Sequence, residues 1–221
     1  MGELDMNPIV IAGGTGYLGR PLIHKLLSAR YSVHAIVREQ SISKAPAGCS
    51  VVEGDVLDSR TYQDRIPRGA AFVHLVGVAH PAPWKADAFR SVDLVALKQS
   101  VAAAGHAGAS RFVFVSVAHP APVMRAFIEV RRECEEIVLR SGLPGTILRP
   151  WYILGPGHRW PYMLLPAYKL LESIPSTRES AVRLGLVTRE QMVAALFSAV
   201  ASPDDGVRIL ETAAIRAALA D

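Results

Sequence analysis

Short apolar runs alternate with segments of helical periodicity along most of the chain. The apolar runs have the length of strands and occur at residues 8–12, 33–37, 51–52, 71–76, 111–116, 146–148 and 207–210. Helices are predicted at residues 19–29, 58–66, 84–104, 123–141 and 193–200. Strands that are buried on both faces and alternate with helices are typical of a parallel sheet, so the pattern predicts an α/β Rossmann fold with a doubly wound parallel sheet.

The chain changes character after residue 150. Residues 151–175 are rich in proline, tryptophan and tyrosine and show no clear period. We expect a single domain over residues 1–221, with a dinucleotide-binding core at 7–150 and a small C-terminal lobe at 151–221 that takes a substrate or a partner. The length of 221 residues suits one large domain.

Composition and charge exclude several classes of protein. Apolar residues make up 50% of the chain and charged residues 20%, which excludes disorder and a coiled coil. The formal net charge is +4, but only Arg131 and Arg132 are adjacent basic residues, so we expect no nucleic-acid partner. No apolar run reaches the ~20 residues of a membrane helix, so no membrane span is expected.

The N-terminal residues and the cysteines bear on the compartment. Residues 1–7 lack the basic start and apolar run of a secretory signal, so we expect a cytoplasmic protein. Cys49 and Cys134 are the only cysteines and form no Cys-x-x-Cys motif. We therefore expect two free thiols and no metal site.

A glycine-rich segment carries the clearest chemical signal. Gly13, Gly16 and Gly19 have the spacing GxxGxxG and lie between the first predicted strand and the first predicted helix. Glycines at this place allow a tight turn, let a diphosphate lie against main-chain N–H groups, and let the helix pack on the sheet. The segment predicts a dinucleotide site, and a purely structural turn is the alternative.

With its Thr15-Gly16 pair, this loop resembles that of the short-chain dehydrogenase/reductase superfamily, in particular its extended and atypical branches of NAD-dependent epimerase/dehydratase-like and NAD(P)H-binding proteins. Further segments support the resemblance: residues 54–58, residues 74–77, Ser116 and residues 148–157. It implies a dinucleotide site in which Gly13, Gly16 and Gly19 hold the diphosphate, and Asp55 and Val56 lie against the adenine. His74, Val76 and Gly77 would lie behind the ribose, and the segment that contains Pro150 would lie beside the nicotinamide. Thr15, Tyr17 and Leu18 of the same loop are also expected to bind the cofactor.

The residue after the second strand bears on the choice of coenzyme. An acidic residue there binds the ribose 2′-hydroxyl of NAD, whereas a basic one accommodates the 2′-phosphate of NADP. Arg38 stands at this place, which favours NADP(H) over NAD(H). Glu39 follows at once and could reverse the preference, and Arg38 could also be a solvated charge at a strand end.

The catalytic positions depart from the family pattern. The resemblance implies a Ser and a Tyr-x-x-x-Lys, and alignment on the downstream Leu-Arg-Pro places that pair at Phe127 and Arg131. Phenylalanine has no proton to give, and arginine stays protonated. The loss of a general acid costs ~10²- to 10⁴-fold in rate. Ser116 matches the family serine, and Arg131 could still bind the ribose or a phosphate.

Other groups could replace the missing tyrosine. The candidates near the expected cleft are His119, Tyr152 and Tyr162, with local packing as the alternative for each. His119 belongs to a short duplication, Val-Ala-His-Pro-Ala-Pro, at residues 78–83 and 117–122. Both copies follow predicted strands, so His80 and His119 could face one cleft, or two turns could simply share a sequence.

Two functions follow from these residues. The first is a catalytically degenerate dinucleotide-binding protein with a sensor, assembly or regulatory role, similar to NmrA-type regulators and the NAD(P)H-binding accessory subunit of respiratory complex I. The second is an NADPH-dependent oxidoreductase or epimerase/dehydratase-like enzyme with another proton donor and a small-molecule substrate. The resemblance also makes a homodimer through residues 84–104 and 123–141 possible, and the oligomeric state stays open.

Overall fold

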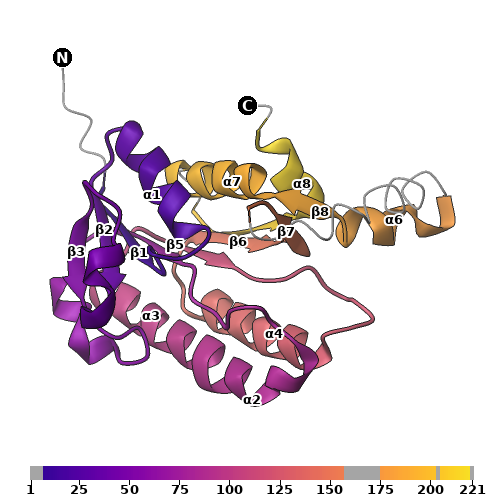
Figure 1. Ribbon diagram of the computed structural model, residues 1–221, viewed down its shortest axis with the longest axis horizontal. Helices are drawn as coiled ribbons and strands as arrows, with labels where there is room; N and C mark the ends of the chain where they lie inside the picture. The colour runs from indigo at the N-terminus through magenta and orange to yellow at the C-terminus, as the bar shows by residue number, and fades with distance from the viewer. Residues whose placement is uncertain (1–6, 157–174, 203–204, 220–221) are drawn as a thin grey trace.

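The computed structural model describes residues 7–156, 175–202 and 205–219, and its centre is a seven-stranded parallel sheet (Figure 1). The strand order is β3-β2-β1-β4-β5-β6-β9. The strands are β1 (Ile9–Ala12), β2 (Val33–Val37), β3 (Ser50–Glu53), β4 (Ala71–His74), β5 (Arg111–Val115), β6 (Gly145–Arg149) and β9 (Val207–Glu211). Every pairing in this sheet is parallel, which confirms the predicted Rossmann fold.

The central strands are apolar because both of their faces are covered. All four residues of β1 are buried, and so are all four residues of β4. Ile9 pairs with Val33 of β2 on one side and with Ala71 of β4 on the other. The chain therefore winds outward in both directions from the β1–β4 pair, and ligands of such sheets bind where the winding reverses.

Helices cover the two faces of the sheet in separate layers. One layer contains α1 (Gly19–Ser28), α7 (Arg189–Ala201) and α8 (Thr212–Ala217), and the other contains α3 (Val95–His106) and α4 (Arg125–Arg140) (Figure 1). Each layer has its own core, with Leu22 and Leu196 on the α1 side and Leu97 and Val138 on the α4 side. Within the described residues, no helix is long and apolar enough to cross a membrane.

The predicted helix over residues 58–66 is wrong. Two 3₁₀ turns, η2 (Ser59–Thr61) and η3 (Gln63–Arg65), take its place. Asp58 caps the first turn, as predicted, because its carboxylate accepts a hydrogen bond from the Arg60 backbone N–H at 3.2 Å. Tyr62 then adopts a φ of −145°, which breaks the helical path and turns a ring that is only 1% exposed into the core.

The segment before α3 is helical but irregular. It runs through a 3₁₀ turn, η4 (Pro83–Lys85), the short α2 (Ala86–Ala88) and a π-helical stretch, η5 (Phe89–Leu94). α4 begins two residues later than predicted, because Met124 has a left-handed backbone with φ of 61°. Val123 is consequently 53% exposed and lies outside the apolar stripe of that helix.

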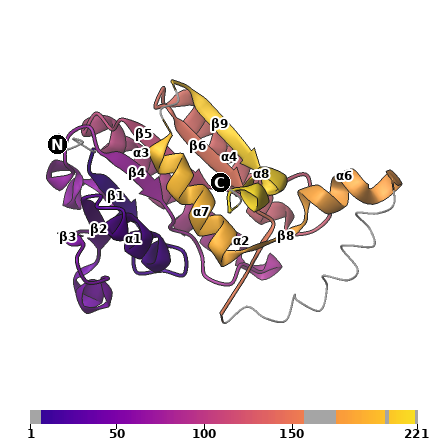
Figure 2. The same ribbon diagram turned by 90° about the horizontal axis from the view of Figure 1, so that it is seen from above.

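The C-terminal part of the chain returns to the main sheet. β9 pairs with β6, and α7 lies beside α1 (Figure 2). A second sheet of two strands, β7 (Tyr152–Leu154) and β8 (Leu186–Thr188), and a helix, α6 (Pro175–Arg183), were not predicted. Much of the expected C-terminal lobe is thus built into the layers of the Rossmann core.

Gly145 offers a test of the sheet. A Cβ at this residue would lie 2.8 Å from the Phe112 carbonyl carbon, so Gly145→Ala forces β5 and β6 apart. We expect a loss of about 1–3 kcal/mol in the free energy of unfolding, measured by urea denaturation. Gly105→Ala in α3, where a Cβ meets nothing within 4 Å, should instead be neutral or stabilise by up to about 1 kcal/mol. Equal effects of the two substitutions would contradict this packing.

Candidate functional site

The glycine-rich loop brings the start of α1 against the end of β1. A Cβ at Gly19 would lie 2.7 Å from the Gly14 Cα, and one at Gly14 would lie 2.9 Å from the Ile23 Cδ1. Gly13 has a φ of +88°, and its carbonyl accepts a hydrogen bond from the Gly16 N–H at 3.0 Å. The loop needs glycine at these places because side chains would collide or strain the backbone.

The start of α1 is shaped for an anion. Its N-cap is Leu18, and no described side chain caps the helix. The N-terminal N–H groups of a helix without such a cap are available to negatively charged oxygens. Gly16 is exposed at the tip of the loop. This open main-chain cradle fits a diphosphate group, so the residues present are suited to a dinucleotide.

The ends of β2 and β3 form the expected adenine side. Arg38 is exposed directly after β2 and precedes the 3₁₀ turn η1 (Glu39–Lys44). The Asp55 carboxylate accepts a hydrogen bond from the Leu57 N–H at 3.0 Å, and the Asp55 N–H donates to Thr61 Oγ1 at 2.9 Å. Asp55 and Val56 are both half-buried. Arg38 and Asp55 therefore lie at neighbouring strand ends, on the side of the sheet edge where the adenine is expected.

The end of β4 lies against a buried ion pair. The Arg131 guanidinium donates to the Asp93 carboxylate at 2.5 Å and to the Val115 carbonyl at 2.9 Å. The Val78 N–H donates to the other Asp93 oxygen at 2.9 Å. A Cβ at Gly77 would overlap the Arg131 guanidinium. Arg131 is 8% exposed and Asp93 is 1% exposed, so the pair closes the floor of the site beneath Gly77.

Phe127 and Arg131 pack together on α4. The Arg131 Cζ lies 5.0 Å from the centre of the Phe127 ring and 5.6 Å from that of Phe114. The Phe127 ring also packs against Phe89, with 5.0 Å between the ring centres. The two residues at the expected tyrosine and lysine positions thus form a packed cation–π and ion-pair unit.

His74 belongs to the core. It is 1% exposed, its Nδ1 lies 2.9 Å from Ser100 Oγ, and its ring stacks on Phe112. Burial, reinforced by the nearby Arg131 charge, lowers the pKa of His74 to about 3, so the imidazole is neutral. His74 is thus a neutral core residue at the end of β4, and a place behind the ribose stays a prediction.

A second polar network joins β5, β6 and α4. Glu135, 4% exposed, accepts a short hydrogen bond from Ser116 Oγ and two hydrogen bonds from the Arg149 guanidinium. His119 Nε2 lies 3.4 Å from the same carboxylate. Arg149 also donates to Glu211 Oε1 at 2.8 Å, which extends the network to β9. The structure thus brings the predicted Ser116 and His119 together around one carboxylate.

The charge state of Glu135 follows from its partners. Burial acts to raise the pKa of its carboxyl, but the hydrogen bonds from Arg149 and Ser116 outweigh burial and hold the pKa below its ordinary value of 4.5. Glu135 is therefore an anion at neutral pH. The carboxylate can accept a hydrogen bond from His119 Nε2 and so orients the imidazole.

Asp93, Glu135 and Glu211 were missed by the sequence analysis. Glu135 follows Phe127 and Arg131 at the same spacing of four, so the helical period could have placed it on the same face. Asp93 sits in the π-helical stretch η5, which the sequence pattern does not reveal. Asp93 and Glu135 each pair with an arginine whose burial the sequence analysis did not predict.

The remaining predicted residues fall into three groups. Leu18, Val76 and Pro150 pack in or against the core, and the Pro150 carbonyl accepts a hydrogen bond from the Ala118 N–H at 2.9 Å. Tyr152 is half-buried at the start of β7. Tyr162 lies outside the described residues.

The two copies of Val-Ala-His-Pro-Ala-Pro differ in structure. His119 is held by Glu135, whereas His80 is exposed with a left-handed φ of 50°. In the described part of the chain, no three His, Cys, Asp or Glu side chains come together as metal ligands. Cys49 and Cys134 are free thiols, as predicted.

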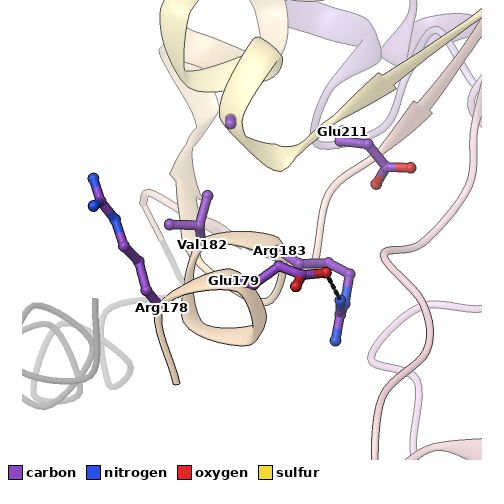
Figure 3. Close-up of a pocket in the computed structure, with 6 residues that line it drawn as sticks. Arg178, Glu179, Val182, Arg183 and Glu211 are labelled. Atoms are coloured by element: carbon purple, nitrogen blue, oxygen red, sulfur yellow. Dashed lines mark hydrogen bonds and ion pairs between the residues drawn. The ribbon is translucent and has the colours of Figure 1, made fainter. Parts of the chain in front are cut away.

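A cavity of about 530 Å³ lies beyond the end of β9, between α6 and α8 (Figure 3). It is lined by Arg178, Glu179, Val182, Arg183, Glu211 and Ala213. Figure 3 shows Glu179 and Arg183 paired on α6, while Glu211 enters from the strand end. Glu211 links this cavity to Arg149, and through it to Glu135.

The doubly wound parallel sheet and the open glycine-rich loop at the end of β1 are those of a dinucleotide-binding Rossmann protein. Residues 13–180 match the NAD(P)H-binding family, and the chain belongs to that family.

Curated relatives include reductases. The chain is 30% identical over 153 residues to ceramide reductase from Caulobacter vibrioides, which covers 67% of this chain and 47% of that protein. It is 23% identical to the protein TIC 62 of Pisum sativum, a chloroplastic protein, over 90% of this chain and 41% of that one. The chain thus spans about half the length of the curated relatives it matches.

Solved structures share the fold at low identity. The Bordetella bronchiseptica enzyme WbmH, solved with NAD⁺, superposes with a TM-score of 0.69 at 19% identity, over 93% of this chain and 75% of that one. The UDP-N-acetylglucosamine 4-epimerase of Bacillus cereus gives a TM-score of 0.68 at 14% identity, over 95% of this chain and 82% of that one.

Glu135 allows a test of the buried network. Glu135→Gln removes the anion between Arg149 and His119, and we expect a loss of about 3–5 kcal/mol in the free energy of unfolding at pH 7. Because the folded-state pKa of Glu135 is depressed, its ionic contribution is complete above pH 4.5 and disappears as pH falls through the folded pKa. The difference between wild type and variant should therefore shrink below pH 4.5.

The neighbouring Glu136 is the matched control. It pairs with Arg140 on the surface, and its side chain is 56% exposed. Glu136→Gln should change the free energy of unfolding by less than about 0.5 kcal/mol at any pH. If Glu136→Gln lowered the free energy of unfolding as much as Glu135→Gln, the network would be contradicted. It would also be contradicted if the effect of Glu135→Gln did not change with pH.

Proposed function

We propose that the protein binds NADP(H) at the edge formed by the glycine-rich loop and that it does not catalyse carbonyl reduction through a tyrosine–lysine pair. It serves instead as a dinucleotide-binding protein with a sensor, assembly or regulatory role. The observation that carries this proposal is the packed unit of Phe127, Arg131 and Asp93. These groups occupy the expected catalytic positions with a ring that has no acidic proton and a guanidinium that is already bonded.

The geometry of Arg131 supports this reading. A catalytic lysine at this position would need to face both the coenzyme ribose and the tyrosine hydroxyl. Arg131 directs its two terminal nitrogens to Asp93 and the Val115 carbonyl, and the release of a buried guanidinium from its carboxylate costs about 3–5 kcal/mol. The pair therefore acts as a structural support beneath the site.

Binding without turnover is the direct test. We expect the purified protein to bind NADPH with micromolar or tighter affinity in a calorimetric titration. We expect no NADPH oxidation above background with generic aldehydes, ketones or nucleotide sugars, because the family proton donor is absent. Absence of binding to either NADPH or NADH would contradict the proposal.

Arg38 sets the expected preference for NADP(H). In the proposed complex the exposed Arg38 side chain, directly after β2, binds the 2′-phosphate, and a charge-assisted hydrogen bond of this kind is worth about 1.5–3 kcal/mol. Arg38→Gln should weaken NADPH binding by about tenfold or more and leave NADH binding unchanged. The control is Glu39→Gln, which should change neither affinity. Weaker NADH binding in the Glu39 variant would instead assign the ribose contact to Glu39 and favour NAD(H).

A second candidate function rests on His119 and Glu135. The 3.4 Å approach of the His119 imidazole to a buried carboxylate is the arrangement of a general acid with its orienting partner. The reductase names of relatives such as ceramide reductase point in the same direction. In this alternative the protein is an NADPH-dependent oxidoreductase or epimerase/dehydratase-like enzyme in which His119 supplies the proton and Ser116 orients the substrate.

Two substitutions separate the candidates. NADPH oxidation by a small carbonyl compound that survives Phe127→Leu and is lost in His119→Ala would favour the enzyme. The cavity bounded by Arg183 and Glu211 is then the proposed place for the rest of the substrate. No oxidation in wild type, with intact NADPH binding, favours the binding protein.

A further inference from the structure

A second cavity, of about 420 Å³, opens on the outer side of the glycine-rich loop. It is lined by Thr15, Gly16, Tyr17, Arg20, Pro21, His24 and Arg189. Among these described lining residues, three carry basic side chains and none is acidic. The basic residues come from α1 and from the start of α7, which lie side by side although more than 160 residues separate them in the sequence (Figure 2).

Arg189 is held against the loop by packing. Its Cζ lies 5.6 Å from the centre of the Tyr17 ring, a cation–π arrangement. A Cβ at Gly155 would lie 3.2 Å from the Arg189 Cβ and 3.4 Å from the Tyr17 Cζ, so these three residues are in close contact. Thr188 and Gln191 form a capping box that fixes the start of α7. Arg189 is thus delivered to the loop from a rigid helix end.

Arg20 approaches the cavity from the other side. It follows Gly19 directly, and its Nη1 donates to the Lys44 carbonyl at 3.1 Å. This contact places its side chain between the glycine-rich loop and the turn η1 that follows Arg38. His24 lies one turn farther along the exposed side of α1. The loop is therefore flanked by guanidinium groups on two sides.

The positive charge of this cavity has little compensation. Among the described residues, Arg189 pairs with Glu190 at 3.6 Å, and the Glu190 side chain is 59% exposed. A loose surface pair of this kind contributes little, so Arg189 remains able to bind a stronger anion. Guanidinium groups match phosphate oxygens in geometry and charge.

We propose that Arg20 and Arg189 bind the phosphate oxygens of a nucleoside diphosphate from the outer side of the loop, while the main chain holds them from within. The ligand class is the diphosphate of the dinucleotide, so this inference rests on the proposed function. It also gives the C-terminal segment a role in coenzyme binding, because Arg189 lies beyond residues 13–180, which match the family.

Fragments of the coenzyme test this assignment. ADP carries the diphosphate without a 2′-phosphate, whereas 2′-AMP carries the 2′-phosphate without a diphosphate. Arg189→Gln should weaken binding of both NADPH and ADP about tenfold, and the double variant with Arg20→Gln should weaken it further. Binding of 2′-AMP should stay within twofold of wild type. Calorimetric titration at low salt measures all three ligands.

Two variants guard against indirect effects. Arg189→Lys keeps the charge and should lose less ADP affinity than Arg189→Gln, whereas an equal loss would overturn the assignment. Arg68→Gln removes the same charge from an exposed site before β4, at the opposite edge of the sheet, and should change no affinity. Equal effects of Arg68→Gln and Arg189→Gln would show general electrostatics and would also overturn it.

The outcomes separate this inference from the proposed function. If wild type binds NADPH and Arg189→Gln binds it equally well, the diphosphate site is wrong and the proposed function stands. If wild type binds ADP through Arg189 but binds neither dinucleotide, the diphosphate site stands and the proposed function is wrong.

Discussion

The structure depends on one close approach, that of α1 to the end of β1. A Cβ at Gly19 would overlap the backbone of Gly13 and Gly14, so only glycine fits where α1 begins. This contact sets the position of α1 on the sheet and turns its N-terminal N–H groups toward the edge where β1 and β4 diverge. The close packing of α1 on the end of β1 therefore also creates the anion-binding site.

A second feature follows from the charges on α4. Arg131 and Glu135 are one helical turn apart and are both buried, each against an opposite charge from another element. Buried pairs gain little net stability over apolar packing, but the removal of one partner is costly. Such pairs fix the register of α4 against η5 and β6. In this chain, polar groups beneath the expected reaction centre hold elements together, whereas the family pattern implies groups that move protons there.

The sequence was sufficient for the sheet and for the glycine-rich loop because both are local. Every predicted strand exists, since runs such as residues 8–12 are apolar on both faces and can only be buried. The misassigned helix at residues 58–66 shows the limit, because the buried Tyr62 ring redirects the backbone there. Asp93, Glu135 and Arg189 gain their importance from partners that lie 14 to 172 residues away in the chain. Pairings of this kind carry no signal in the local pattern.

The most direct test of the account is a crystal structure grown with NADPH. The account predicts a diphosphate seated on the main chain of Tyr17 and Leu18, with the Arg131–Asp93 ion pair intact and Phe127 still packed on Phe89. A dinucleotide bound elsewhere, or an Arg131 released from Asp93 to hold the ribose, would contradict it.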